Sequence, residues 1–147
     1  MNQTRANEKV TKALALVEDA NHAKLLVALA SSYKDQGAAV EKAMLNIALE
    51  MLNDVSTEMW ECVKRQLKHE ADPADSMTTE EAVIANANGY ALEIVAQFPD
   101  LDPARVEKDL FAASVIVAAA SRKACYDRLN KLVKEREAEL AAQAAAV

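Results

Sequence analysis

A short segment near the middle of the chain places one imidazole and three carboxylates close together. They belong to His69, Glu70, Asp72 and Asp75. Hard and borderline cations take ligands of this kind. The spacing, however, matches neither an EF-hand loop nor a zinc site. The segment therefore predicts a helix end followed by a solvated acidic loop, and we expect no metal site there.

The other histidine, His22, lacks the partners that catalysis needs. Glu18 and Asp19 are near in sequence, but nothing supplies a nucleophile or a group that would stabilise developing charge. The sequence contains no Glu-x-x-His pair of a di-iron bundle, no G-x-G-x-x-G fingerprint, no Walker loop and no H-E-x-x-H zinc motif. We therefore predict no enzymatic activity, no catalytic residue and no cofactor.

A basic stretch late in the sequence is a candidate for binding nucleic acid. Residues 122–136 contain six bases and two acids, with Tyr126 among them, and such a helix face could contact phosphates. The alternative is a solvated face supported by pairs such as Asp127–Lys131. This alternative is favoured, because the whole chain has a net charge of −6. Nucleic acid is thus a less favoured partner, and its candidate contacts are Arg122, Lys123, Arg128, Lys131 and Lys134.

Two apolar stretches are candidates for a protein interface. Residues 110–120 are apolar nearly all round, so a helix there must be enclosed by other helices or by another subunit. In the segment 38–69, methionines repack easily, and an exposed tryptophan would anchor a partner. The simpler alternative is that these side chains belong to the core of the chain itself. The interface candidates are Met59, Trp60, Leu110, Phe111, Val115 and Val117.

The elements that carry these residues are predicted to be helices. The chain has two glycines and three prolines among 147 residues, and 52% of its residues are hydrophobic. A chain that seldom needs a positive φ angle has few tight turns and few hairpins. Aromatic residues make up only 4%, so aliphatic side chains and methionine must fill the core. We predict one all-α domain over residues 1–147, a bundle of four to five helices including two long ones.

Apolar spacings of three and four place the first two helical segments. The first spans about 7–33 and contains a polar interruption at 18–22. This leaves two alternatives, one continuous helix or two helices with Asn21 as the N-cap of the second. Gly37 is expected to end the segment as a C′ glycine. The second segment spans about 38–69 and predicts a single long helix.

Capping signals place the remaining helices. A capping box at Thr78–Glu81 begins the third helix. Asp102 as N-cap and Pro103 at the first helical position begin the last helix, which runs to about Ala142. The Ala-rich residues 139–147 are expected to fray.

The sequence favours a cytoplasmic protein. Cys62 and Cys125 fall in predicted helices among apolar neighbours, so we expect buried, reduced thiols. The first residues contain no apolar core of a secretion signal. The longest apolar run, 112–120 around Ser114, is much too short to span a bilayer. We therefore expect no membrane partner.

These patterns favour a protein that acts by binding. Residues 70–109 hold ten acids and two bases, whereas 122–136 is basic, and such a dipolar charge distribution helps to orient a partner. We expect a non-enzymatic regulator, inhibitor or assembly component whose partner is another protein or itself, most simply as a homodimer. The alternative is a nucleic-acid-associated protein that uses the basic stretch. The short, acidic, helical composition also resembles that of small bacteriophage proteins that interact with the host or assemble virions.

Overall fold

The computed structural model describes residues 2–70 and 79–146, with side chains from residue 5 onward. Within these residues there are five α-helices, one short 3₁₀ helix and no strand, so the predicted all-α fold is confirmed. The α-helices are α1 (Asn2–Val17), α2 (His22–Ser31), α3 (Ala38–Leu67), α4 (Thr79–Gln97) and α5 (Pro103–Ala146), and the 3₁₀ helix η1 spans Lys34–Gln36. The two long helices are α3 and α5.

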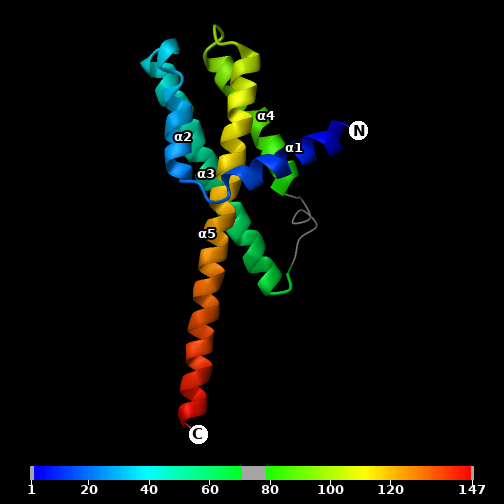
Figure 1. Ribbon diagram of the computed structural model, residues 1–147, viewed down its shortest axis with the longest axis vertical. Coiled ribbons are helices and arrows are strands. Elements are labelled where there is room, and N and C mark those ends of the chain that lie inside the picture. Colours follow the sequence, from blue (N-terminus) through cyan, green and yellow to red (C-terminus); the bar gives the residue numbers. More distant parts are fainter. Residues whose placement is uncertain (1, 71–78, 147) are drawn as a thin grey trace.

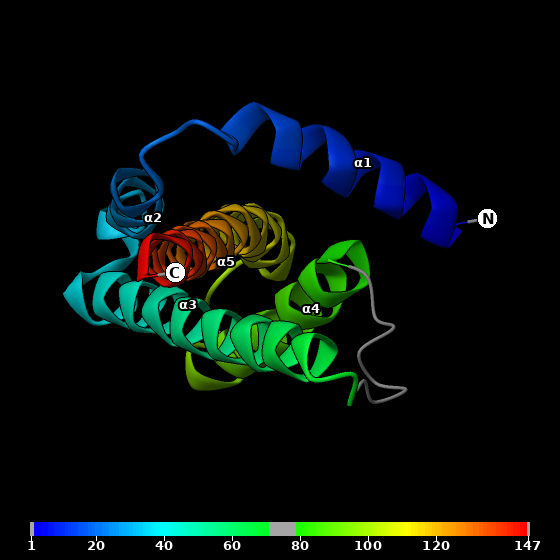
Figure 2. The same ribbon diagram turned by 90° about the horizontal axis from the view of Figure 1, so that it is seen from below.

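The last helix, α5, is the axis of the bundle. In the end-on view of Figure 2, α1, α2, α3 and α4 surround α5, and each of them contacts it. In the side view of Figure 1, the first part of α5 lies among the other helices, the end of α3 reaches down beside its orange turns, and its last, dark orange and red part projects beyond them. A single helix therefore both organises the core and extends out of it.

The polar interruption after α1 separates two helices. Asn21 has an extended backbone, with φ −78° and ψ 96°, and its side chain accepts a 3.1 Å hydrogen bond from the Lys24 N–H. Nε2 of His22 donates to the Val17 carbonyl at 2.8 Å, which satisfies one of the last carbonyls of α1. Asn21 is thus the N-cap of α2, and His22 stabilises the preceding helix end.

Positive φ angles precede and follow α3. Gly37 adopts φ 102° and ψ 157°, a conformation essentially restricted to glycine, and it ends η1 rather than α2. His69 adopts φ 59° after the helix. There the Glu70 N–H donates to the Arg65 carbonyl at 2.8 Å, and the His69 N–H donates to the Gln66 carbonyl at 3.1 Å. This is the Schellman pattern, with histidine in the position that glycine usually occupies.

The start of α5 lies where the sequence predicts it, but its end lies further along. Asp102 accepts a 3.1 Å hydrogen bond from the Ala104 N–H, and Pro103 is the first helical residue. The helix continues to Ala146, through residues that we expected to fray. The physical reason is composition, because Ala, Leu, Glu, Lys and Arg have the highest helix propensities.

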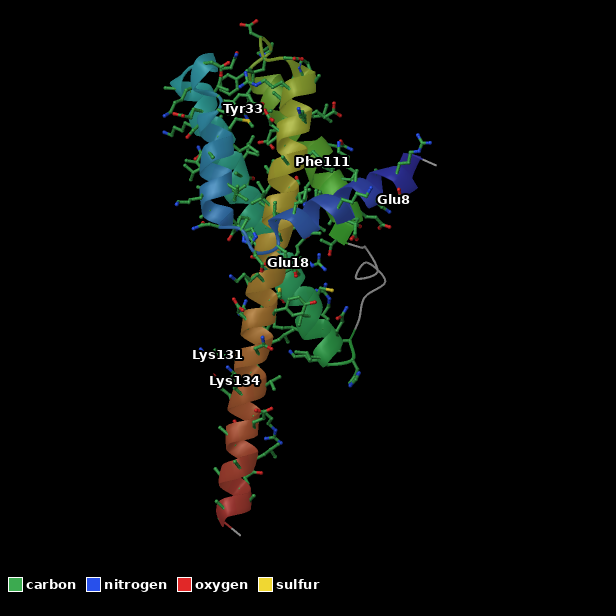
Figure 3. The ribbon with its side chains drawn as sticks, viewed as in Figure 1. Glu8, Glu18, Tyr33, Phe111, Lys131 and Lys134 are labelled. Carbon is green, nitrogen blue, oxygen red and sulfur yellow. The ribbon has the colours of Figure 1, made fainter. Side chains whose placement is uncertain are left out.

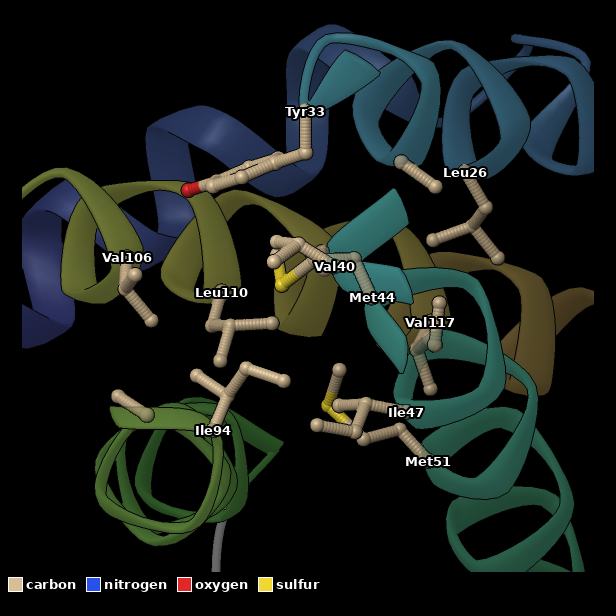
Figure 4. Packing of buried hydrophobic residues seen from close by; sticks show 14 of the residues in the cluster. Leu26, Tyr33, Val40, Met44, Ile47, Met51, Ile94, Val106, Leu110 and Val117 are labelled. Carbon is tan, nitrogen blue, oxygen red and sulfur yellow. The ribbon is translucent and has the colours of Figure 1, made fainter. Parts of the chain in front are cut away.

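The main core lies where α2, α3 and α4 meet the first part of α5. Figure 4 shows Met44 and Met51 of α3 facing Ile94 of α4 and Leu110 of α5, and all four side chains are 0% exposed. Tyr33 is the one aromatic residue among the fully buried side chains of the described chain. Aliphatic side chains and methionine therefore fill the core, as the composition predicts.

A second, smaller core forms where α1 crosses α4 and α5. Val10 and Leu14 of α1 pack there with Val83 of α4 and with Val115 and Ala118 of α5. Because the side chain of Ala118 is small, the crossing helices can approach closely there. This crossing brings the end of α1 beside the middle of α5, more than a hundred residues later in the chain.

Candidate interaction surface

The apolar stretch of α5 is covered by the chain's own helices. Leu110, Val115 and Val117 are 0%, 2% and 1% exposed, and they belong to the two cores. Phe111 is half-buried, with the Lys9 ammonium 4.7 Å from its ring centroid. The bundle itself thus supplies the enclosure that this stretch needs, and in this conformation Leu110, Val115 and Val117 offer no surface to a partner.

The two candidates on α3 lie in the second half of that helix, and Figure 1 shows that this half diverges from α5. Met59 and Trp60 are both half-buried. The Arg128 guanidinium lies 3.9 Å from the Trp60 ring centroid, so a cation–π contact occupies the indole. One turn earlier, the hydroxyls of Ser56 and Ser121 are 2.9 Å apart and join the same two helices. Trp60 therefore packs against α5 of its own chain and helps to join α3 to α5.

The remainder of α5 is open to solvent. We call residues 126–146 the distal segment, and all of its side chains are exposed except that of Leu129, which is half-buried. At 1.5 Å per residue this segment is about 30 Å long. Figure 3 shows Lys131 and Lys134 at about the level where α3 ends, and the rest of the segment projects below the bundle. Arg136 pairs with Glu139 at 3.0 Å within the segment.

Large apolar side chains are concentrated on the distal segment. It carries four of the nine large hydrophobic residues that are exposed in the described chain, namely Tyr126 (62%), Leu132 (46%), Val133 (53%) and Leu140 (48%). Tyr126, Val133 and Leu140 are seven residues apart, so they lie on one face of the helix. We call these three residues the apolar stripe. Such a stripe on an isolated helix is typical of a helix that pairs with another.

The five basic candidates are dispersed around α5. Arg122 and Lys123 line a cleft beside α1, whereas Arg128 lies on Trp60 of α3. Lys131 and Lys134 share their part of the surface with two acids, Asp127 and Glu135. The arrangement does not form one continuous row of bases.

The cleft has a volume of about 470 Å³ and lies between the end of α1, α4 and α5. Its two bases come from α5, and its three acids come from α4 and the turn after α1. Among the residues that the structure describes, no ion pair joins these bases to these acids. The lining includes Leu14, Ala119, Tyr126, Arg122, Lys123, Glu18, Asp19 and Glu80.

The thiol of Cys125 on α5 is not activated for chemistry. Cys125 is 6% exposed. Burial, opposed by the Arg128 charge and supported by the neighbouring Cys62, raises the pKa of the Cys125 thiol. A thiol with a raised pKa is a poor nucleophile at neutral pH.

The comparisons with known proteins identify no site, so the site is defined by the geometry alone. No protein family, curated protein or solved structure matches the chain. Within residues 2–70 and 79–146, no three His, Cys, Asp or Glu side chains lie close enough together to hold a metal ion. None of the helices in these ranges combines the length and apolarity that crossing a membrane requires. The segment 71–75 and the expected cap Thr78 lie outside the described residues.

The apolar stripe was not predicted from the sequence, although a signal was present. The seven-residue spacing of Tyr126, Val133 and Leu140 is visible in the sequence. Tyr126 was grouped with the surrounding bases, and Leu140 fell in a segment expected to fray. The cleft had no local signal, because α1 reaches α5 only through the tertiary fold.

Proposed function

We propose that this protein works by self-association through the apolar stripe of its distal segment, as a non-enzymatic regulator, inhibitor or assembly component. The observation that supports the proposal is the exposure of Tyr126, Val133 and Leu140 on a projecting helix. Covering apolar surface stabilises an assembly by about 25 cal/mol per Å². Most helical stability in proteins comes from packing such a face, and none of the described helices packs on this one.

A second copy of the chain is the simplest partner. It carries the same stripe at the same spacing, and a two-fold arrangement lets both stripes be covered at once. The cores of the two bundles stay intact in this assembly, because the distal segment makes no contribution to them. The proposal therefore requires no rearrangement of either copy.

The test is light scattering on the peak from size-exclusion chromatography, over a range of protein concentrations. We expect the wild type to pass from monomer to dimer as concentration rises. Val133→Glu places a charge in the centre of the stripe, where pairing would bury it, and we expect dimerisation to weaken by about ten-fold or more. Circular dichroism should show unchanged helicity, because Val133 packs in neither core.

The matched control is Leu92→Glu on α4. Leu92 is 75% exposed and lies away from the distal segment, so this variant receives the same charge without touching the stripe. It should dimerise like the wild type. A wild type that remains monomeric at every concentration, or equal losses in both variants, would contradict the proposal.

The same peak distinguishes the nucleic-acid alternative. A protein that uses Lys131 and Lys134 to bind phosphates would retain nucleic acid at low salt and release it as salt rises. The ratio of absorbance at 260 and 280 nm reports this directly. We expect a ratio typical of protein alone, since acids share the surface around both lysines.

A further inference from the structure

The apolar stripe continues into the cleft at the base of the distal segment. Ala119 lines the cleft, and Tyr126, Val133 and Leu140 follow it at intervals of seven residues. Residues seven apart lie on nearly the same face of a helix, and a sustained repeat of seven is the pattern of paired helices. A partner helix that packs along the stripe therefore leads to the cleft of the chain that carries the stripe.

The charges along this part of α5 change sign at its middle. Residues 122–134 hold five bases and one acid, whereas residues 135–146 hold three acids and one base. Two such helices attract one another when they run in opposite directions, because the basic part of each then lies beside the acidic part of the other. In the parallel arrangement, basic residues would face basic residues.

Arg136 adds a second argument against the parallel arrangement. It lies three residues after Val133 and four before Leu140, which is the position next to the stripe in a heptad. A parallel pair would bring the two copies of Arg136 together at the interface. An antiparallel pair separates them and lets each guanidinium reach the Tyr126 end of the other stripe, where a cation–π contact is favourable.

We infer that two copies pair their distal segments antiparallel, so that the tip of each segment points at the cleft of the other copy. This inference rests on the self-association proposed above and names its geometry. In the cleft, Arg122 and Lys123 have no ion pair with the acids that the structure describes, and they are in reach of the acidic part of an antiparallel partner. Residues 141–146 of the arriving tip carry no charge, which suits a cleft whose remaining charges are acidic.

The test is cross-linking between single cysteines introduced at the two ends of the stripe. The native thiols are first removed by Cys62→Ala and Cys125→Ala, and light scattering establishes that this background still dimerises. Tyr126→Cys and Leu140→Cys are then prepared as separate chains in this background. Both sites are exposed, so neither change disturbs a core. Each chain alone, and an equimolar mixture after subunit exchange, is treated with a short bismaleimide.

The expected result is a cross-linked dimer from the mixture only, with mass spectrometry joining position 126 of one chain to position 140 of the other. In an antiparallel pair the two copies of position 140 are about 20 Å apart along the helix axis, beyond the reach of a short linker. Leu92→Cys in the same background serves as the control and should not cross-link.

The other outcomes separate the inference from the proposed function. A dimer in which Leu140→Cys alone cross-links efficiently is parallel, and it overturns the antiparallel geometry while leaving self-association intact. A dimer in which no combination cross-links forms through another surface, and it overturns both the geometry and the role of the stripe. If both the cysteine-free background and the wild type are monomeric, the protein does not self-associate, and the proposed function is overturned. If the wild type dimerises but the alanine background does not, the introduced cysteines are placed in a background with Cys62→Ser and Cys125→Ser instead.

Discussion

At the scale of single residues, one polar cluster joins the η1 end of the bundle to α5. The Tyr33 hydroxyl donates to an Asp109 carboxylate oxygen at 2.7 Å. The Arg105 guanidinium lies 4.2 Å from the Tyr33 ring centroid and pairs with Asp35 at 3.0 Å. Arg105 also donates to the Ser32 carbonyl at 2.8 Å. These contacts join residues that are seventy or more positions apart in the sequence, and they fix where α2 lies against α5.

Tyr33→Phe tests this cluster, since it removes one hydroxyl and keeps the buried ring. A hydrogen bond to a charged group contributes about 1.5–3 kcal/mol, and Asp109 is partly exposed, so we expect a loss of about 1.5 kcal/mol in the free energy of unfolding. Urea denaturation followed by circular dichroism measures it. Tyr126→Phe, at an exposed tyrosine, is the control and should leave stability unchanged at concentrations where the protein is monomeric.

The same hydroxyl predicts a loss of stability at alkaline pH. Burial raises the pKa of the Tyr33 hydroxyl far above its ordinary value, and the hydrogen bond to Asp109 and the negative charge of Asp109 raise it further. The unfolded chain therefore loses this proton first, at a pKa of about 10. The stabilisation from Tyr33 is fully present below that pH and is lost as pH rises above it. In Tyr33→Phe, the free energy of unfolding should decline less steeply above pH 10 than in the wild type. An unchanged decline would contradict the role given to the Tyr33 hydroxyl.

At the scale of elements, backbone conformation decides what each glycine does. Gly37 has a positive φ of 102° at the start of α3, whereas Gly89 lies in the interior of α4. An added Cβ would meet no heavy atom within 4 Å at either position. The difference between the two sites is therefore one of conformational strain and entropy, and steric contact plays no part.

Alanine substitutions at the two glycines should change stability in opposite directions. Gly89→Ala restricts the unfolded chain and suits a helix, so we expect a gain of about 0.5–1 kcal/mol. Gly37→Ala forces a Cβ into a conformation that L residues avoid, at a cost of about 1–3 kcal/mol. Thermal unfolding of the two variants beside the wild type measures both effects. A gain at Gly37 would mean that its backbone differs from the conformation described.

At the scale of the whole molecule, α5 has two parts with different surroundings. Residues 103–125 are enclosed by four other helices, whereas the distal segment meets other helices only near its start, where Tyr126 lines the cleft and Arg128 lies on Trp60, and its described side chains from residue 130 onward are exposed. The enclosed part can open only when the bundle opens. From residue 130 onward the described part of α5 is held by its own helical hydrogen bonds, so under the proposed self-association its stability should depend on protein concentration.

Hydrogen exchange followed by mass spectrometry tests this division. At low protein concentration we expect the amides of the distal segment to exchange much faster than those of residues 106–125. Raising the concentration should slow exchange in the distal segment only, and Val133→Glu should abolish that dependence. Uniform protection along α5 at every concentration would show that the distal segment is stabilised without a partner.

The sequence by itself determined the helical class, most helix limits and the composition of the core. These properties are local or nearly so. Asn21, Asp102 and Pro103 act on the backbone groups beside them, and the spacing of apolar side chains sets which face of a helix is buried. The structure continues α5 to Ala146, four residues beyond the expected end, because its Ala-rich composition favours helix, and the fraying of residues 139–147 stays a prediction.

Only the tertiary structure decided which apolar residues remain available to a partner. The sequence predicts that residues 110–120 are enclosed but leaves open whether the chain itself or another subunit encloses them; in the structure Val115 is 2% exposed, whereas Val133 is 53% exposed. The difference depends on how far the surrounding helices extend along α5, and this in turn depends on contacts such as that between Trp60 and Arg128. Which helix covers a given side chain depends on pairs of residues distant in sequence, and no local pattern encodes that choice.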